Sequence, residues 1–141
     1  MSLPVPPEWH ILVVRTDFSD DDAWRAVCDL IAAAECEGYA PSIVLVEDRG
    51  FDGASVADLA QLADPAGPAY IFVVDSRTLA DSEHPVIVVD LDVVYGQVGR
   101  VFRTIPAEVA GIEANLSIAN MDFEEFAEAT DGDGVFRGFT Q

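Results

Sequence analysis

Four aspartates follow the four most apolar segments of the chain, each close to the end of a segment. They are Asp17, Asp48, Asp75 and Asp90. If the segments are parallel strands, their carboxyl ends share one edge of the sheet, which is where open α/β folds bind ligands. Carboxylate oxygens suit Mg²⁺, whose usual work is to orient phosphoryl groups. The pattern therefore predicts a candidate Mg²⁺ site at that edge. The alternative is chance, because a chain this acidic places Asp after most strands.

The other residue types restrict the chemistry that the chain can perform. All seven basic residues are Arg, so Schiff-base catalysis and phosphate binding by a P-loop lysine are excluded. His10 and His84 lie outside any nucleophile motif. Cys28 and Cys36 fall in one predicted helix, where eight residues separate their Cα atoms by about 12 Å, too far for a disulfide. No cofactor is expected, although Mg²⁺ remains an alternative.

The segments that would position the aspartates are short, β-branched and uninterrupted. Such runs are typical of strands buried on both faces of a sheet. Amphipathic helices are predicted between them, and alternating strands and helices favour right-handed crossovers and a parallel sheet. The predicted strands are Ile11–Val14, Ile43–Val46, Ile71–Val74 and Val86–Val89.

The direction of the fourth strand is left open by the sequence. The link from Asp75 to Pro85 is shorter than most parallel crossovers, so this strand can run antiparallel. In that case Asp90 would be carried to the other edge of the sheet. A turn at 95–99 then leads into a fifth, edge-like strand at 100–105, whose exposure would permit dimerisation.

Capping residues and apolar periodicity predict four helices. Ser19 is the expected N-cap of the first helix, whose apolar periodicity covers Ser19 to Ala34 and which Gly38 stops, with i, i+4 pairs joining Asp21, Arg25 and Asp29. Ser55 caps the second. Pro106 begins the third, and Asp122 caps the last, with Glu125 three residues on.

We expect one α/β domain over residues 1–141. It has a mixed, mostly parallel sheet of about five strands, flanking helices, a C-terminal helical segment, a Pro-rich arm at 1–9 and a Gly- and Asp-containing tail at 131–141.

The charge of the chain points to the kind of partner it would meet. With 26 acidic residues against seven Arg, the formal net charge is −19. Such a field repels phosphate backbones and disfavours nucleic-acid binding, whereas a basic protein is the natural partner. The alternative is a solvated surface selected for solubility or for a salty cytosol. The N-terminus has neither the basic nor the apolar region of a signal peptide, and no run is long enough to span a bilayer, so a cytoplasmic protein is expected.

Two motifs and a tail give the chain a family resemblance. Residues 16–24 (TDFSDDDAW), 115–127 (NLSIANMDFEEFA) and 134–139 (GVFRGF) resemble an uncharacterised family of small acidic bacterial proteins, over about Ile11 to Phe139. The resemblance implies no activity. It makes five positions the first to mutate: Asp17, Trp24, Asn120, Asp122 and Arg137. Of these, Asp122 and Arg137 are the candidate partner-binding residues. An Arg between two Phe can present an anchor to a partner, or it can fold back onto Asp122 or Glu125 in a structural role.

Two functions therefore compete. The leading hypothesis is a non-enzymatic interaction module, such as an inhibitor or immunity-like protein, whose acidic face meets a basic partner. The alternative is a Mg²⁺-dependent enzyme at the carboxyl edge of the sheet. A small-molecule sensor at the same edge is a third hypothesis. Neither partner nor oligomeric state follows from the sequence.

Overall fold

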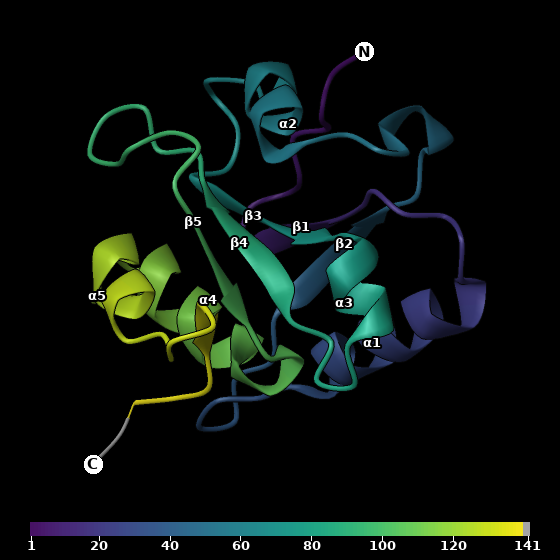
Figure 1. Cartoon of the computed structure of the whole chain (residues 1–141). Coiled ribbons are helices and arrows are strands. Elements are labelled where there is room, and N and C mark those ends of the chain that lie inside the picture. Colours follow the sequence, from purple (N-terminus) through teal and green to yellow (C-terminus); the bar gives the residue numbers. More distant parts are fainter. Residues whose placement is uncertain (140–141) are drawn as a thin grey trace.

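The structure is a computed structural model and describes residues 1–139. One six-stranded sheet forms its centre, with strand order β2-β1-β3-β4-β5-β6 (Figure 1). The α-helices are short except for the first. The strands are β1 (His10–Arg15), β2 (Ser42–Val46), β3 (Tyr70–Val74), β4 (Val86–Asp90), β5 (Val101–Thr104) and β6 (Val135–Phe136). The helices are α1 (Asp21–Ala33), α2 (Val56–Leu62), α3 (Ser76–Ala80), α4 (Val109–Ser117) and α5 (Phe123–Glu128), with 3-10 turns η1 (Arg49–Phe51) and η2 (Pro106–Glu108).

The sheet is mixed, and its directions resolve the question about the fourth strand. β1 pairs in parallel with both β2 and β3, and β5 pairs in parallel with β6. β4 is antiparallel to both β3 and β5. The short link before β4 thus reverses the chain, as its length allowed. The predicted fold class, a single α/β domain with a mostly parallel mixed sheet and C-terminal helices, is confirmed.

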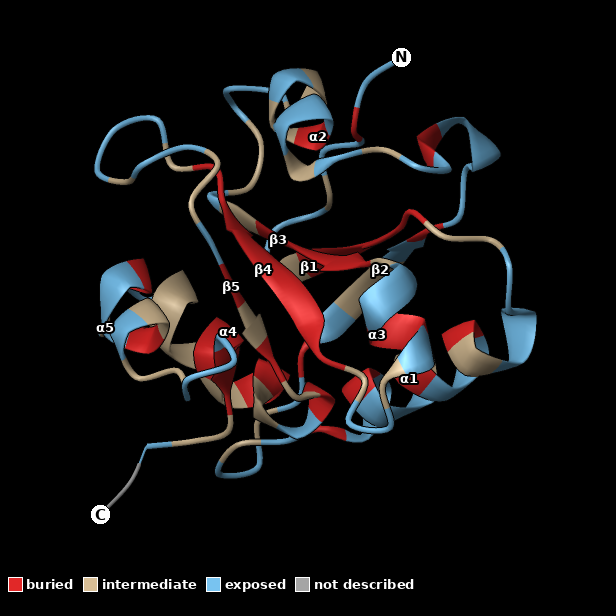
Figure 2. Ribbon diagram, viewed as in Figure 1, coloured by how far each residue is buried: buried red, intermediate tan, exposed pale blue. Residues whose placement is uncertain are grey.

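Helices cover both faces of the sheet and form two cores. The larger core joins one sheet face to α1, α3, α4 and α5, through buried residues that include Trp24, Leu79, Ile112 and Phe126. The smaller core joins the other face to α2 and the N-terminal arm. Leu3 of that arm is buried, and its N–H donates to the carbonyl of Leu62 at 2.9 Å. Buried residues therefore line the sheet on both faces (Figure 2).

The start of α1 differs from the prediction. Asp20 is the N-cap, accepting from the N–H of Ala23 at 3.0 Å, while Ser19 donates to Asp17. The expected i, i+4 pairs are also absent among the described residues, because Asp21 pairs with Arg15 and Arg25 with Asp22. Ser19 was the wrong N-cap because several adjacent polar residues can each cap a helix.

Two elements extend the predicted set. The link between β3 and β4 contains α3, and the tail folds back as β6 against β5. The fifth strand is therefore not an edge strand. The last two tail residues, 140 and 141, lie outside the described residues. Within residues 1–139, no helix combines the length and the apolar character needed to cross a membrane.

Candidate functional site

The four strand-end aspartates lie at two edges of the sheet. Asp17, Asp48 and Asp75 follow the parallel strands β1, β2 and β3 and lie at their carboxyl edge. Asp90, at the end of the reversed strand β4, is opposite Tyr70, the first residue of β3. The fourth member of the predicted metal set is therefore at the opposite edge. Among the residues described, no group of three or more His, Cys, Asp or Glu side chains could hold a metal ion.

The three carboxylates at the carboxyl edge have local protein partners. Asp17 accepts from the N–H of Ser19 at 2.8 Å, and Asp48 accepts from the N–H of Gly50 at 2.8 Å. Asp75 caps α3 and forms two hydrogen bonds with the guanidinium of Arg103, at 2.9 and 2.6 Å. These contacts give each aspartate a role in local structure.

Asp75 has a perturbed pKa. Burial alone would raise the pKa of this carboxyl, but hydrogen bonds from Arg103 and Thr78, with the nearby charge of Arg103, lower it overall. The carboxylate of Asp75 is thus held ionised by a cation and a helix N-terminus. Its pairing partner comes from β5, so the contact joins the parallel and antiparallel halves of the sheet.

Arg15, the residue directly before the first sequence motif, is a buried cation at the same edge. Arg15 is almost fully buried, donates to Asp21 at 2.7 Å, and lies 3.8 Å from Glu47. Its guanidinium carbon is 4.5 Å from the ring centroid of Phe18 and 5.3 Å from that of Trp24. A buried cation with carboxylate and aromatic partners stabilises this corner and leaves few of its donors unused.

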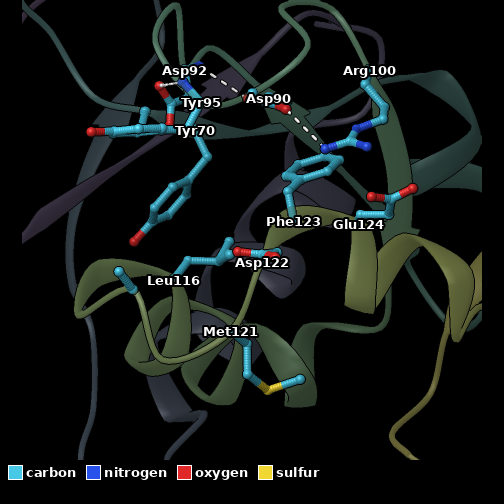
Figure 3. Close-up of a pocket in the computed structure, with 13 residues that line it drawn as sticks. Tyr70, Asp90, Asp92, Tyr95, Arg100, Leu116, Met121, Asp122, Phe123 and Glu124 are labelled. Carbon is cyan, nitrogen blue, oxygen red and sulfur yellow. Dashed lines mark hydrogen bonds and ion pairs between the residues drawn. The ribbon is translucent and has the colours of Figure 1, made fainter.

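The opposite edge contains a cavity of about 390 Å³. Three segments enclose it: the start of β3, residues 91–100 between β4 and β5, and residues 116–124, from the end of α4 to the start of α5 (Figure 3). Residues 91–100 are called the β4–β5 loop below. The volume is within the range of small-ligand pockets. The lining residues are Ala69, Tyr70, Asp90, Asp92, Tyr95, Gly96, Arg100, Leu116, Ala119, Met121, Asp122, Phe123 and Glu124.

The carboxylate of Asp90 holds the β4–β5 loop in place by accepting backbone hydrogen bonds from it. Its side chain is buried, with one oxygen accepting from the N–H of Asp92 at 2.9 Å and the other from the N–H of Gln97 at 2.9 Å. Gly96 passes so close that a Cβ atom there would be 2.4 Å from Oδ1 of Asp90. The loop therefore requires both the buried carboxylate and the glycine.

Arg100 is the cation of the cavity wall. Its Nη2 is 3.3 Å from Oδ2 of Asp90, and its guanidinium carbon is 5.0 Å from the ring centroid of Phe123. Its Nε atom is buried and has no hydrogen-bond partner among residues 1–139. Against this cation the wall has four carboxylates, from Asp90, Asp92, Asp122 and Glu124. The cavity is therefore electronegative at neutral pH.

Tyr70 connects the cavity to a buried carboxylate. Its hydroxyl is 3.4 Å from Oε1 of Glu113, a residue of α4 that is buried. Within the described part of the chain, Oε2 of Glu113 has no hydrogen-bond partner. Burial, with the adjacent Glu113 charge, raises the pKa of Tyr70, and the same causes raise the pKa of Tyr39 to about 12. Both tyrosines are therefore neutral hydroxyl donors at neutral pH.

The two candidate partner-binding residues are in different surroundings. Asp122 is the N-cap residue of α5, and its carboxylate lies on the cavity wall (Figure 3). Arg137 folds back, but onto Glu83, Asp131 and Asp133, at 2.8, 2.7 and 2.7 Å, rather than onto Asp122 or Glu125. Hydrogen bonding to Arg137 lowers the pKa of Asp133 to about 2. The structure does not bring Asp122 and Arg137 together.

Sequence reasoning missed Tyr70, Asp92 and Arg100 as members of one site. The sequence places Asp92 and the turn glycines close to Asp90. Only the antiparallel direction of β4, however, brings the β4–β5 loop towards residues 116–124. The available signal for Arg100 was its position directly after a predicted turn, in a chain with only seven basic residues.

Fold and site together define a mixed-sheet α/β domain with an electronegative cavity at the edge opposite the usual ligand crevice. A family model described as a domain of unknown function (DUF6924) matches residues 10–139, and the chain belongs to that family. The match confirms the expected membership of an uncharacterised family over most of the chain. No curated protein matches the sequence.

Proposed function

We propose that this protein is a non-enzymatic binding module that presents the β4–β5 loop and its acidic surroundings to a basic protein partner. The observation that carries the proposal is the exposed apolar character of this loop. Tyr95 is 93% exposed and Val94 72%, and Val93 and Val98 are also exposed. Ile118, between two cavity-lining residues of the facing segment, is exposed as well. Grouped apolar side chains with a polar surround are typical of protein–protein interaction sites.

The loop is suited to association because its backbone is already ordered. Asp90 and Asp92 accept hydrogen bonds from backbone N–H groups of residues 92, 94, 95 and 97. A preorganised loop loses little conformational entropy on binding. An exposed tyrosine is also among the residue types that contribute most to interface affinity.

Charge favours a basic partner over a second copy of the same chain. Two molecules of net charge −19 repel each other, whereas a cationic protein is attracted and its association is accelerated. Added salt screens both effects. The proposal therefore includes a salt-sensitive complex.

Native co-purification tests this proposal. Tagged wild-type protein is expected to retain a partner from native lysate at low salt and to release it when NaCl is added. A Val94→Gln/Tyr95→Gln variant should lose that partner. Leu30→Gln, which replaces an exposed apolar residue on α1, should retain it. No retained protein, or equal retention by the loop variant, would contradict the proposed function.

A further inference from the structure

We propose that the cavity beside the β4–β5 loop binds an arginine side chain of the basic partner. This inference rests on the proposed function for the source of the side chain, but its chemistry follows from the cavity itself. The cavity has an apolar portion and a charged portion. Tyr70, Leu116 and Phe123 supply the apolar surface. Such a lining suits a ligand with a hydrocarbon stem and a polar end.

The charges on the wall select a cation. Four carboxylates and one guanidinium line the cavity, and the guanidinium of Arg100 is paired with Asp90. Within residues 1–139, Asp92, Asp122 and Glu124 form no ion pair. A negatively charged ligand would face these three carboxylates, whereas a positively charged one would compensate them.

Geometry favours a guanidinium over an ammonium. Figure 3 shows Asp92 and Asp122 on different sides of the cavity, with the ring of Tyr70 between the two segments that carry them. A guanidinium has five N–H donors in a plane and can bind more than one carboxylate while stacking on an aromatic ring. Aromatic faces attract cations. Arg100 already uses this chemistry on the same wall, where it lies over Phe123.

The cavity adjoins the surface proposed for the partner. Tyr95 belongs to both, since it lines the cavity and is the most exposed large apolar residue of the β4–β5 loop. A partner that packs on the loop can therefore place one side chain into the cavity. Buried anchor side chains of this kind are typical of the centre of an interface, and Arg is enriched among them.

Titration with a small probe, followed by ¹H–¹⁵N NMR, tests the inference without the partner. The probe is N-acetyl-arginine N-methylamide. We expect saturable shifts of the amide signals of Gly96, Asp122 and Phe123. The citrulline analogue, which is neutral and nearly isosteric, should bind at least tenfold more weakly, and the glutamate analogue should not bind there. Equal binding of arginine and citrulline probes, or shifts that follow the acidic surface without saturation, would overturn the inference.

Charge-matched variants locate the site. Asp122→Asn retains a good N-cap residue and Glu124→Gln a good helix former, so both should fold. Each should weaken the arginine probe about threefold at low salt, as expected for a single exposed charge pair. Glu128→Gln removes the same charge from α5 outside the cavity and should leave affinity unchanged. Equal weakening by Glu128→Gln would also overturn the inference.

The two proposals can fail separately. If the arginine probe does not bind, but a partner is still lost from the Val94→Gln/Tyr95→Gln variant, the cavity inference is wrong and the binding module stands. If the probe binds in the cavity and no partner is retained by the wild type, the proposed function is wrong and the cavity is a site for small guanidinium compounds.

Discussion

At the residue scale, Asp75 is the aspartate at the carboxyl edge of the sheet whose carboxylate accepts the most hydrogen bonds. It accepts from Arg103 on β5 and from the N–H and hydroxyl of Thr78 in α3. Arg103 also donates to the carbonyl of Pro85 at 3.0 Å. One side chain therefore ties the end of β3 to a helix and, through Arg103, to the antiparallel strands.

Replacement of Asp75 tests this structural role. Asp75→Asn removes the charge but retains a capping side chain, so we expect a loss of about 2 kcal/mol in the free energy of unfolding at pH 7. The folded-state pKa of Asp75 is lowered below its ordinary value of 3.8. The pair is therefore fully stabilising above that value, and its contribution is lost as pH falls below it. Urea unfolding of both proteins from pH 7 to pH 3 should show the difference shrinking below about pH 4. A constant difference across this range would contradict the assignment.

Sequence reasoning located the strand-end aspartates but not what each one contacts. Asp17, Asp48 and Asp75 were placed after strands because apolar runs end where loops begin, and that local pattern is visible in the chain. Their partners are set by tertiary packing. Arg103 is 28 residues from Asp75, and no periodicity connects the two.

At the element scale, the β4–β5 loop depends on one close approach. Gly96 lies against the buried carboxylate of Asp90, and any Cβ atom there would overlap that carboxylate. The same carboxylate accepts from the N–H groups of Asp92 and Gln97. Loop and strand end therefore form a single hydrogen-bonded unit.

A methyl group at position 96 should break this unit. We expect Gly96→Ala to destabilise the protein by about 1–3 kcal/mol, because the buried carboxylate must move from its donors. Hydrogen exchange at the amides of Asp92 and Gln97 should accelerate. Gly132→Ala is the matched control, since a Cβ atom there meets no atom of the described residues within 4 Å. Unchanged exchange at both amides in Gly96→Ala would contradict this account.

Helices and strands were predicted correctly where the element is long enough and its residue pattern is clear. The four apolar runs and the cap residues Ser55 and Asp122 were identified because their signals are local. α3 has five residues, too few for a helical period, and β6 has two. β6 exists through its pairing with β5, so the sequence of the tail alone does not specify it.

At the scale of the whole molecule, net charge opposes compactness. A formal charge of −19 repels itself, while the ion pairs of Arg15, Arg103 and Arg137 are local attractions. Salt screens both, but long-range repulsion among exposed carboxylates involves many more charges. The repulsion should therefore dominate the response to salt.

We expect the melting temperature to rise by several degrees between 20 and 500 mM NaCl, with KCl acting alike. Calorimetry or circular dichroism would measure it, and a fall in melting temperature would show that the ion pairs dominate instead. Mg²⁺, Ca²⁺ and Mn²⁺ at matched ionic strength extend the experiment. A specific ligand at 100 times its dissociation constant adds about 2.7 kcal/mol, so a rise confined to one ion would reveal a metal site.

The reversal of the chain at β4 also bears on the order in which the protein folds. β3, β4 and β5 pair with their immediate neighbours in sequence, whereas the pairing of β1 with β3 brings Thr16 to Val74, 58 residues away. Closing long loops slows folding, so local pairs gain contacts earlier. We infer that the β3–β4–β5 meander belongs to the folding nucleus and the β1–β3 seam closes late. Substitutions in the seam should then mainly accelerate unfolding, while those in the meander slow folding. The strands that frame the cavity would be assembled before the edge that other α/β proteins use for ligands.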